Sequence, residues 1–306
     1  MIKQRIVLIL GAGASIPYGF PSGEALRANI IKDLSKSTAQ PFQLLEAAGF
    51  EAKHITNFRS ALQQSGQRSV DAFLEHRSEF VGIGKVAIAA ALIPYEVEDK
   101  LWDADENWYR YLWHRLGPTL NDVMGSQLRV ITFNYERSFE HYFFSALRNS
   151  YNISTTQAAN VVRDILRVVH VYGKLGPLPW ESDANGRSYH PVEPANMRDA
   201  ALTAAKAIKI VPESDEGDQS FVDARTLLKA AESVIFLGFG YLPKNVERLG
   251  IVNLPSGVLL TGTAYGLLEG DCTDALRAVN SRLTLGNRNH GVLEFLRTHR
   301  LLPNAL

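Results

Sequence analysis

Two polar residues that follow or interrupt apolar runs are the clearest candidates for chemistry in this sequence. Asn134 comes directly after residues 130–133, and its amide can donate and accept hydrogen bonds at once, which suits orienting a water molecule or holding a ribose hydroxyl. The alternative is that Asn134 caps a following helix, with Glu136 favouring the helix dipole. His170 lies between valines, so it is either a proton acceptor in a site or a core histidine whose ring nitrogens are hydrogen-bonded.

A glycine-rich turn at residues 11–15 follows the apolar run 6–10. Its small residues let backbone N–H groups approach a phosphate closely, while the alternative is a tight turn without a ligand. The dinucleotide fingerprint G-x-G-x-x-G is only partly met, because Ile16 occupies the third glycine position. Asp33 has the spacing of the acid that dehydrogenases use for the adenosine ribose, but it falls within a predicted helix, which weakens a hydride-transfer interpretation.

Two later glycine turns have the same placement after apolar runs. Gly238 and Gly240 follow residues 233–237, and Gly262 and Thr263 follow residues 257–260. Glycines there would let a nucleotide lie close to the backbone, and the alternative is again a tight turn at the end of a strand.

Strands and helices that alternate must position these groups. The predicted strands are 6–10, 129–133, 166–172, 208–211, 233–237 and 257–260. A helix capped by Ser22 follows the first turn, and residues 40–126 are helical throughout. We therefore predict an α/β fold, a Rossmann-like doubly wound parallel sheet with a large helical insertion at about 40–126, in a single domain spanning 1–306. Residues 173–198 are predicted to form a long loop, with a mobile flap as one form of it.

Composition excludes several classes of protein. The 306 residues carry 32 basic and 32 acidic side chains, so no global charge favours nucleic acid or anionic membrane. Cys272 is the single cysteine, which excludes an intramolecular disulfide framework and a zinc site built from several thiolates. The eight histidines are scattered, so no metal is expected. We read no export signal, and the apolar stretch 86–94 is too short to span a membrane, so we expect a cytoplasmic protein.

The order of these motifs resembles the sirtuin family, particularly the bacterial sirtuin-like proteins of anti-phage defence. Four stretches carry the resemblance, and they occur in the family's order: 11–15 with Pro21 and Ser22, 132–136, 170–176, and 236–240 followed by 262–264. A further segment at 69–74 is common in the bacterial branch.

The resemblance implies a Rossmann-like sheet with a helical subdomain, NAD as ligand, and Asn134 as the catalytic asparagine. The family's histidine directly precedes the glycine that corresponds to Gly173, where this chain has Tyr172 instead. Residues two apart in a strand share a face, so His170 is expected to face the site from slightly deeper, and the alternative is that Tyr172 supplies a hydroxyl. Asp71, preceded by the potential cap Ser69, is expected to be an early-helix acid outside the catalytic set.

The resemblance also implies a set of NAD-binding residues. They are Gly11, Ala12, Gly13, Ser15, Pro21, Ser22, Thr132, Asn134, Tyr172, Gly173, Gly238, Gly240, Gly262 and Thr263.

Sirtuin deacetylases usually carry a four-cysteine zinc site, which the single cysteine of this chain cannot form. The zinc-free branch that the chain resembles is similar instead to enzymes that hydrolyse NAD, so the resemblance implies, as the leading hypothesis, an NAD hydrolase that depletes the cell's NAD during phage infection. Nicotinamide leaves NAD as a neutral molecule, so the reaction needs no acid on the leaving side and is compatible with Asn134 and His170 as the catalytic residues. The alternatives are a sensor that binds NAD or ADP-ribose without cleaving it, and a protein deacylase or ADP-ribosyltransferase. The sequence does not distinguish hydrolysis of NAD to ADP-ribose from formation of cyclic ADP-ribose.

A toxic NAD hydrolase must be held inactive, so the resemblance also implies a homo-oligomer or a partner defence protein that controls activity. The aromatic residues at 102–113 are either part of such an interface or part of the core.

Overall fold

The computed structural model describes residues 2–182, 185–210 and 217–302. Its centre is a six-stranded sheet with the strand order β3-β2-β1-β4-β5-β6, in which every neighbouring pair is parallel. The strands are β1 (Ile6–Leu10), β2 (Leu128–Thr132), β3 (Val168–His170), β4 (Ser233–Leu237), β5 (Leu259–Gly262) and β6 (Leu283–Leu285). The predicted α/β class with a Rossmann-like parallel sheet is confirmed.

The central strands β1 and β4 are buried along their whole length. Each pairs with a strand on both sides, so neither edge of these strands meets solvent. A strand in this position has helices over both faces, which explains why residues 6–10 form one continuous apolar run instead of alternating with polar residues.

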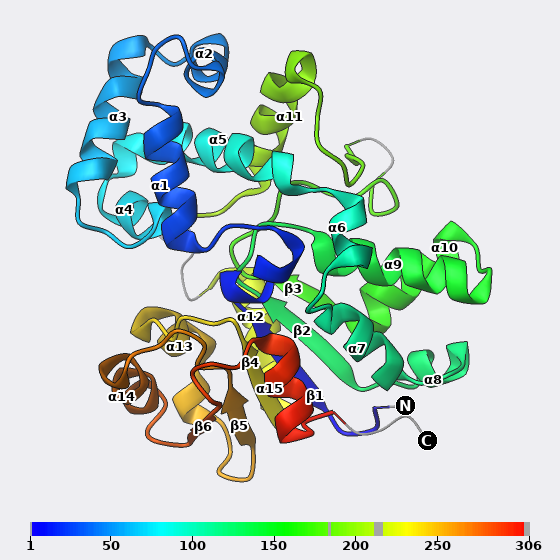
Figure 1. Cartoon of the computed structure of the whole chain (residues 1–306). Helices are drawn as coiled ribbons and strands as arrows, with labels where there is room; N and C mark the ends of the chain where they lie inside the picture. Colours follow the sequence, from blue (N-terminus) through cyan, green and yellow to red (C-terminus); the bar gives the residue numbers. More distant parts are fainter. Residues whose placement is uncertain (1, 183–184, 211–216, 303–306) are drawn as a thin grey trace.

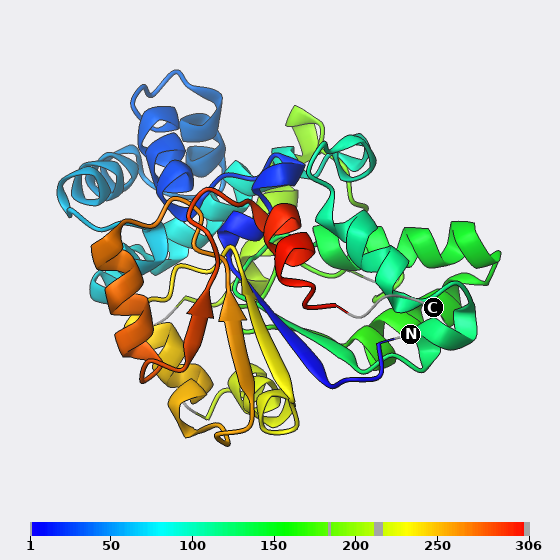
Figure 2. The ribbon, with the colours of Figure 1, turned by 60° about the horizontal axis from the view of Figure 1, so that its bottom comes forward.

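Helices alone fill the described chain between β1 and β2, as predicted for residues 40–126. They are α1 (Gly23–Asp33), α2 (Gln40–Ala47), α3 (Ala52–Gln64), α4 (Val70–His76), α5 (Val81–Leu92), α6 (Glu98–Asp103), α7 (Trp108–Leu116) and α8 (Leu120–Met124), with the short 3-10 turns η1 to η4. Figure 1 shows α1–α5 grouped at one end of the sheet, and Figure 2 shows the arrowheads of β5 and β6 pointing towards that group. The carboxyl ends of the parallel strands therefore face the helical insertion.

The later helices complete the layers around the sheet. They are α9 (Ser138–Tyr151), α10 (Thr155–Asn160), the π-helical turn η5 (Val161–Leu166), α11 (Pro194–Ala207), α12 (Gln219–Lys229), α13 (Pro243–Leu249), the 3-10 turn η7 (Ile251–Asn253), α14 (Glu269–Ala278) and α15 (Val292–His299). Helix α11 packs on α5 and α2, so it joins the helical insertion although it lies far away in sequence.

Three predicted strands differ from the structure, and the one predicted at 257–260 is shifted by two residues to Leu259–Gly262, as β5. The strand predicted at 166–172 is limited to β3, because Leu166 ends the π-helical turn and Arg167 has a left-handed backbone with a φ of 43°. The strand predicted at 208–211 is wrong for its described residues: Ile208 makes an isolated antiparallel bridge with Gly173 directly after α11, outside the sheet. Val211 lies outside the described residues.

Two further expectations need correction. Strand β6 was not predicted, because three residues at the edge of the sheet give no periodic signal. The loop predicted at 173–198 ends earlier, since α11 begins at Pro194. Its described part is also anchored, because the buried Arg137 guanidinium donates to the carbonyls of Pro177, Arg187 and Ser188, so it does not form a free flap.

One helical stretch within the described residues, Ser78–Tyr95, is long and apolar enough to cross a membrane, with a mean hydropathy of 1.3 over 18 residues. Half of it is buried inside the protein, and its α5 portion packs against α1, α2 and α11. The core helix of a soluble protein can be equally long and apolar, so this helix is weak evidence for a membrane span.

The aromatic segment at 102–113 contributes to the core. Trp108 and Tyr109 are fully buried, and the Trp108 indole donates to the carbonyl of Ala14 at 2.8 Å. The core interpretation is therefore confirmed for these two residues, and Trp108 holds the glycine turn that follows β1.

Candidate active site at the strand ends

A cavity of about 200 Å³ lies at the carboxyl ends of the strands. We call it the strand-end cavity. The strand order reverses between β1 and β4, and open parallel sheets bind ligands at this point. Its walls come from the turns after β1, β2, β3 and β4 and from helices α4 and α13. The lining residues are Gly11, Ala12, Ser69, Asp71, Ala72, Glu75, Phe133, Asn134, Tyr135, Tyr172, Phe239, Gly240, Leu242, Lys244 and Asn245.

Asn134 is fixed in this cavity by its own amide nitrogen. The nitrogen donates to the Gly11 carbonyl at 3.1 Å and to the Ser15 hydroxyl at 3.0 Å. Because the Gly11 carbonyl can only accept, this orientation of the amide is the one that satisfies both groups. The amide oxygen has no partner among the described residues, so it is available to a ligand.

Glu136, and not Asn134, accepts a hydrogen bond from the backbone at the start of helix α9. One of its carboxylate oxygens accepts from the Ser138 backbone N–H at 2.6 Å, and the other accepts from the Ser15 hydroxyl at 2.6 Å. Burial raises the pKa of Glu136, and the hydrogen bonds from Ser138 and Ser15 oppose that rise. The helix-cap interpretation of Asn134 is therefore wrong, and its side chain is held by a Ser15–Glu136 pair beneath the cavity.

The glycine turn at 11–15 uses most of its backbone amides inside the protein. Four of its five N–H groups donate to carbonyls of the chain: Gly11 to Leu237, Gly13 to Gly238, Ala14 to Gly11, and Ser15 to Ala12. The remaining residue of the turn, Ala12, lines the cavity. The four bonded amides favour the alternative of a tight turn for most of this segment.

The glycines of this turn are required by close packing of the backbone. A Cβ atom on Gly13 would lie 2.8 Å from the Cα of Gly238, and one on Gly238 would lie 2.0 Å from the nitrogen of Ala14. Gly238 also has a φ of +57°, a conformation that side chains disfavour. The tight-turn alternative explains both glycines, since the turns after β1 and β4 touch each other directly.

His170 lies outside the strand-end cavity. One of its ring nitrogens is 2.9 Å from the Asn134 carbonyl oxygen, and the other is 2.6 Å from a carboxylate oxygen of Glu140. Both partners accept hydrogen bonds, so each ring nitrogen donates and neither is free to take a proton. Burial alone would raise the pKa of Glu140, but the charge and hydrogen bond of His170, together with Lys174, lower it to about 2. The core interpretation of His170 fits this geometry.

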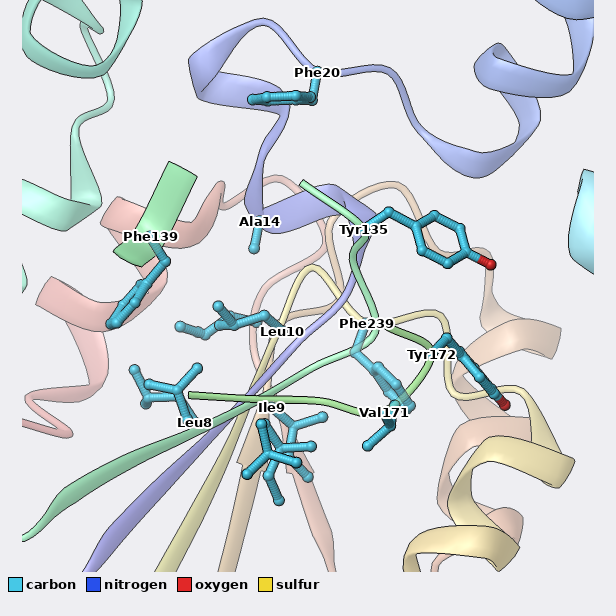
Figure 3. Close-up of a cluster of buried hydrophobic side chains, with 14 of the residues drawn as sticks. Leu8, Ile9, Leu10, Ala14, Phe20, Tyr135, Phe139, Val171, Tyr172 and Phe239 are labelled. Carbon is cyan, nitrogen blue, oxygen red and sulfur yellow. The ribbon is translucent and has the colours of Figure 1, made fainter. Parts of the chain in front are cut away.

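Tyr172 takes the place in the cavity that was expected for His170. Strand β3 ends at His170, so the two residues do not share a strand face and the alternation rule no longer applies to them. The Tyr172 hydroxyl donates to the Asn245 side chain at 2.8 Å and accepts from Arg248 at 3.2 Å. Burial raises the pKa of Tyr172. Figure 3 shows the hydroxyl groups of Tyr135 and Tyr172 pointing away from Leu10 and Phe139.

The structure brings part of the predicted binding set into the cavity. The predicted residues that line it are Gly11, Ala12, Asn134, Tyr172 and Gly240. The predicted residues that do not line it are Gly13, Ser15, Pro21, Ser22, Thr132, Gly173, Gly238, Gly262 and Thr263.

Several of these outer residues have a structural role. The Thr132 hydroxyl accepts from the Asn134 N–H at 3.1 Å, and the Thr263 hydroxyl accepts from the Gly238 N–H at 2.8 Å. Ser22 caps α1 by accepting from Ala25. Thr132 and Thr263 thus hold the turns after β2 and β4 that line the cavity, whereas Ser22 stabilises the start of α1.

Helix α4 supplies cavity residues that sequence reasoning left out. Ser69 caps α4 by accepting from Ala72, as expected, and this places Asp71 in the first turn. Asp71 also lines the cavity and accepts a hydrogen bond from the Tyr135 hydroxyl. Glu75, one turn later, forms an ion pair with Lys244 of α13. The segment 69–74 was a visible signal, but its approach to Asn134 depends on a tertiary contact that no local pattern records.

A larger cavity of about 600 Å³ lies between α1, α2, α5 and α11. Its lining is mostly alanine, leucine and proline, and it lies away from the strand ends. Asp33 lines this cavity, so it is remote from the switch point where a dehydrogenase acid would bind the adenosine ribose. The strand-end cavity is the better candidate for chemistry, because it combines an available amide oxygen with carboxylates.

Within the described residues, no group of three or more His, Cys, Asp or Glu side chains is arranged to hold a metal ion. No model of a known protein family matches the chain, and no curated protein matches it.

Proposed function

We propose that the protein hydrolyses NAD to nicotinamide and ADP-ribose in the strand-end cavity. The observation that carries the proposal is the Asn134 amide oxygen, held without a protein partner at the switch point of the sheet. The order of motifs that resembles the sirtuin family supports NAD as the substrate. The same resemblance supports a role in anti-phage defence by NAD depletion, under the control of a partner protein or of oligomer formation.

The chemistry that Asn134 must perform is modest. Nicotinamide leaves as a neutral molecule from a cationic pyridinium, so the enzyme has to hold the ribose, stabilise an oxocarbenium-like transition state and position water. The amide oxygen accepts a hydrogen bond from a ribose hydroxyl or from the water. Because its amide nitrogen is held by Gly11 and Ser15, the oxygen needs no reorganisation before the reaction.

The size of the cavity fits one end of the dinucleotide. About 200 Å³ is below the roughly 300–1,000 Å³ of pockets that enclose a small-molecule ligand. The nicotinamide ribose is the part that must reach Asn134. Aromatic side chains of Phe133, Tyr172 and Phe239 line the same space and suit the flat face of the pyridinium ring.

One observation favours a second function, a sensor that binds NAD or ADP-ribose without cleaving it. His170 has both ring nitrogens engaged, and four of the five amides of the glycine turn are bonded within the protein. A site without a histidine base and with few free donors is compatible with binding alone.

The test is nicotinamide release from NAD by the purified protein, measured for the wild type, Asn134→Ala and Asn149→Ala. Asn149 is exposed on α9, where its amide bonds the Ser145 carbonyl, so it controls for the substitution itself. The proposal expects release by the wild type and by Asn149→Ala, and its loss in Asn134→Ala with the fold intact. Chromatography of the second product separates ADP-ribose from its cyclic form.

The contrary results are equally specific. Saturable binding of NAD or ADP-ribose without release, under all conditions and with candidate partner proteins added, would establish the sensor instead. Full release by Asn134→Ala would remove Asn134 from the mechanism.

A further inference from the structure

Hydrolysis of NAD at this site needs a proton acceptor. Water attacks C1′ of the nicotinamide ribose, the bond from C1′ to the pyridinium nitrogen breaks, and its electron pair stays on nicotinamide. The attacking water must then lose one proton. His170 cannot receive that proton in the observed arrangement, because it lies outside the cavity and both its ring nitrogens donate hydrogen bonds.

Among the residues that the structure describes, two carboxylates line the strand-end cavity, and both come from helix α4. Glu75 is engaged in the ion pair with Lys244, whose ammonium neutralises it. Asp71 has a different partner, the hydroxyl of Tyr135, which is the residue directly after Asn134 in the chain. Asp71 is therefore hydrogen-bonded to the neighbour of Asn134 in the chain, and both Asp71 and Asn134 line the strand-end cavity.

We propose that Asp71 is the general base of this site and that Tyr135 is the residue that positions it. The inference rests on the proposed function and adds the acceptor for the proton of water. Asp71 takes the proton as the oxygen of water bonds to C1′, and it later releases the proton to solvent, so NAD and water become ADP-ribose, nicotinamide and one proton.

The placement of Asp71 is rigid enough for this role. Ser69 caps α4 and fixes the first turn of the helix, in which Asp71 lies. Tyr135 is 7% exposed, and its hydroxyl lies between Asp71 and the Lys209 carbonyl, which is 3.3 Å away. The hydroxyl can donate to only one of them at a time, and Asp71 is the closer partner.

The groups around Asp71 determine the pKa of its carboxyl. Burial raises its pKa, and the hydrogen bond from Tyr135 lowers it. In the described part of the chain, the other titratable or charged groups that line the cavity are Glu75 on α4, Tyr172 after β3 and Lys244 on α13. Arg248 of α13 lies next to them, because it donates to the Tyr172 hydroxyl. A carboxylate with a raised pKa is a stronger base than one at the ordinary value, while it remains ionised above that pKa.

The test compares Asp71→Asn with Glu24→Gln. Glu24 stands two residues after the cap Ser22 of α1, as Asp71 stands two residues after Ser69, but Glu24 is exposed and outside the cavity. Asp71→Asn is expected to lower kcat for nicotinamide release by about 10²–10⁴-fold while NAD binding, measured by calorimetry, is kept. Glu24→Gln is expected to behave as the wild type.

A second variant, Tyr135→Phe, keeps the inference testable if Asp71→Asn does not fold. The wild-type kcat should fall as the pH drops through the pKa of Asp71, since the base becomes protonated. Removing the Tyr135 hydroxyl removes a bond that lowers this pKa, so the acidic limb of the profile should move to higher pH. A purely structural role of Tyr135 would lower activity without moving that limb.

The outcomes separate the two proposals. Release by the wild type that persists in Asp71→Asn, or an acidic limb that Tyr135→Phe does not move, would overturn the assignment of Asp71 and leave the proposed function standing. No release by the wild type with any partner would overturn both.

Discussion

Asn134 follows strand β2 and His170 is the last residue of the neighbouring strand β3, and their side chains have opposite roles in the structure. Thr132 of β2 pairs with His170 of β3, so the two candidate residues start from the same level of the sheet. Asn134 keeps its amide oxygen available in the strand-end cavity, whereas His170 is enclosed in an ion pair with Glu140. The comparison teaches that a motif identifies a polar residue, while the partners of that residue decide whether it is available for chemistry.

A second buried ion pair, like that of His170, is expected to have a structural role. Arg137 and Glu96 are both fully buried, and two guanidinium nitrogens contact the two carboxylate oxygens at 2.8 and 2.6 Å. Arg137 also holds the long loop through backbone carbonyls. We therefore expect changes at these two ion pairs to affect stability, and changes in the cavity to affect turnover.

The largest effect on stability is expected for Arg137→Ala. This change leaves Glu96 buried with Arg187 as its remaining partner, and should lower the free energy of unfolding by about 3–5 kcal/mol. Urea denaturation measures it. The control is Arg5→Ala, whose ion pair with Glu232 is about half exposed and should contribute less than about 1 kcal/mol. Similar losses for both variants would contradict the buried-pair account.

His170→Ala is expected to rank next. It leaves the Glu140 carboxylate buried, but Lys174 remains 3.5 Å away as a partial partner, so the loss should be near the lower limit, roughly 3 kcal/mol. Thermal and urea denaturation measure the loss. If His170→Ala were as stable as the wild type, His170 would not be the structural partner of Glu140.

Acid should remove the contribution of Glu140. The pKa of its carboxyl is lowered from 4.5 to about 2 in the folded state, so the folded state binds fewer protons than the unfolded state between these values. The stability that Glu140 supplies is therefore full above pH 4.5 and is lost as the pH falls towards 2. The difference in unfolding free energy between the wild type and Glu140→Gln should shrink over this range, and a constant difference would contradict the assignment.

The smallest effect is expected at the edge of the cavity. Lys244→Gln removes the ion pair with Glu75, but the lysine side chain is 47% exposed. Solvent screens such a pair, so the free energy of unfolding should change by less than about 1 kcal/mol. A loss as large as that of His170→Ala would show that this ion pair behaves like a buried one.

The sequence predicted the frame of the molecule better than the use of its polar residues. The apolar runs of β1, β2 and β4 give strong local signals, and so does the serine that caps α1. The run around His170 is as apolar as a longer strand, but a π-helical turn and a left-handed residue shorten it. These features depend on packing against neighbouring helices, which local periodicity does not record.

The same limit applies to the cavity. Asn134 was predictable because it follows a strand at the carboxyl edge. Tyr172 was predicted only through the resemblance of the motif at 170–176, because it ends the predicted strand 166–172. Asp71 comes from a helix about sixty residues away in sequence, which packs on α1 and α5, and its contact with Tyr135 places it at the site. The sequence predicts that Ser15 and Gly238 bind the ligand. In the structure Ser15 donates to Glu136, and Gly238 packs against the backbone of the turn at 11–15.

The most direct test of the comparison is nicotinamide release per folded molecule by Asn134→Ala and His170→Ala, measured side by side with the wild type. We predict that the wild type releases nicotinamide, that Asn134→Ala does not, and that the folded fraction of His170→Ala still does, at a rate lowered only by the lost support of the Asn134 carbonyl. Equal loss of release in both variants would contradict the account, because it would place His170 in the chemistry and not in the ion pair with Glu140.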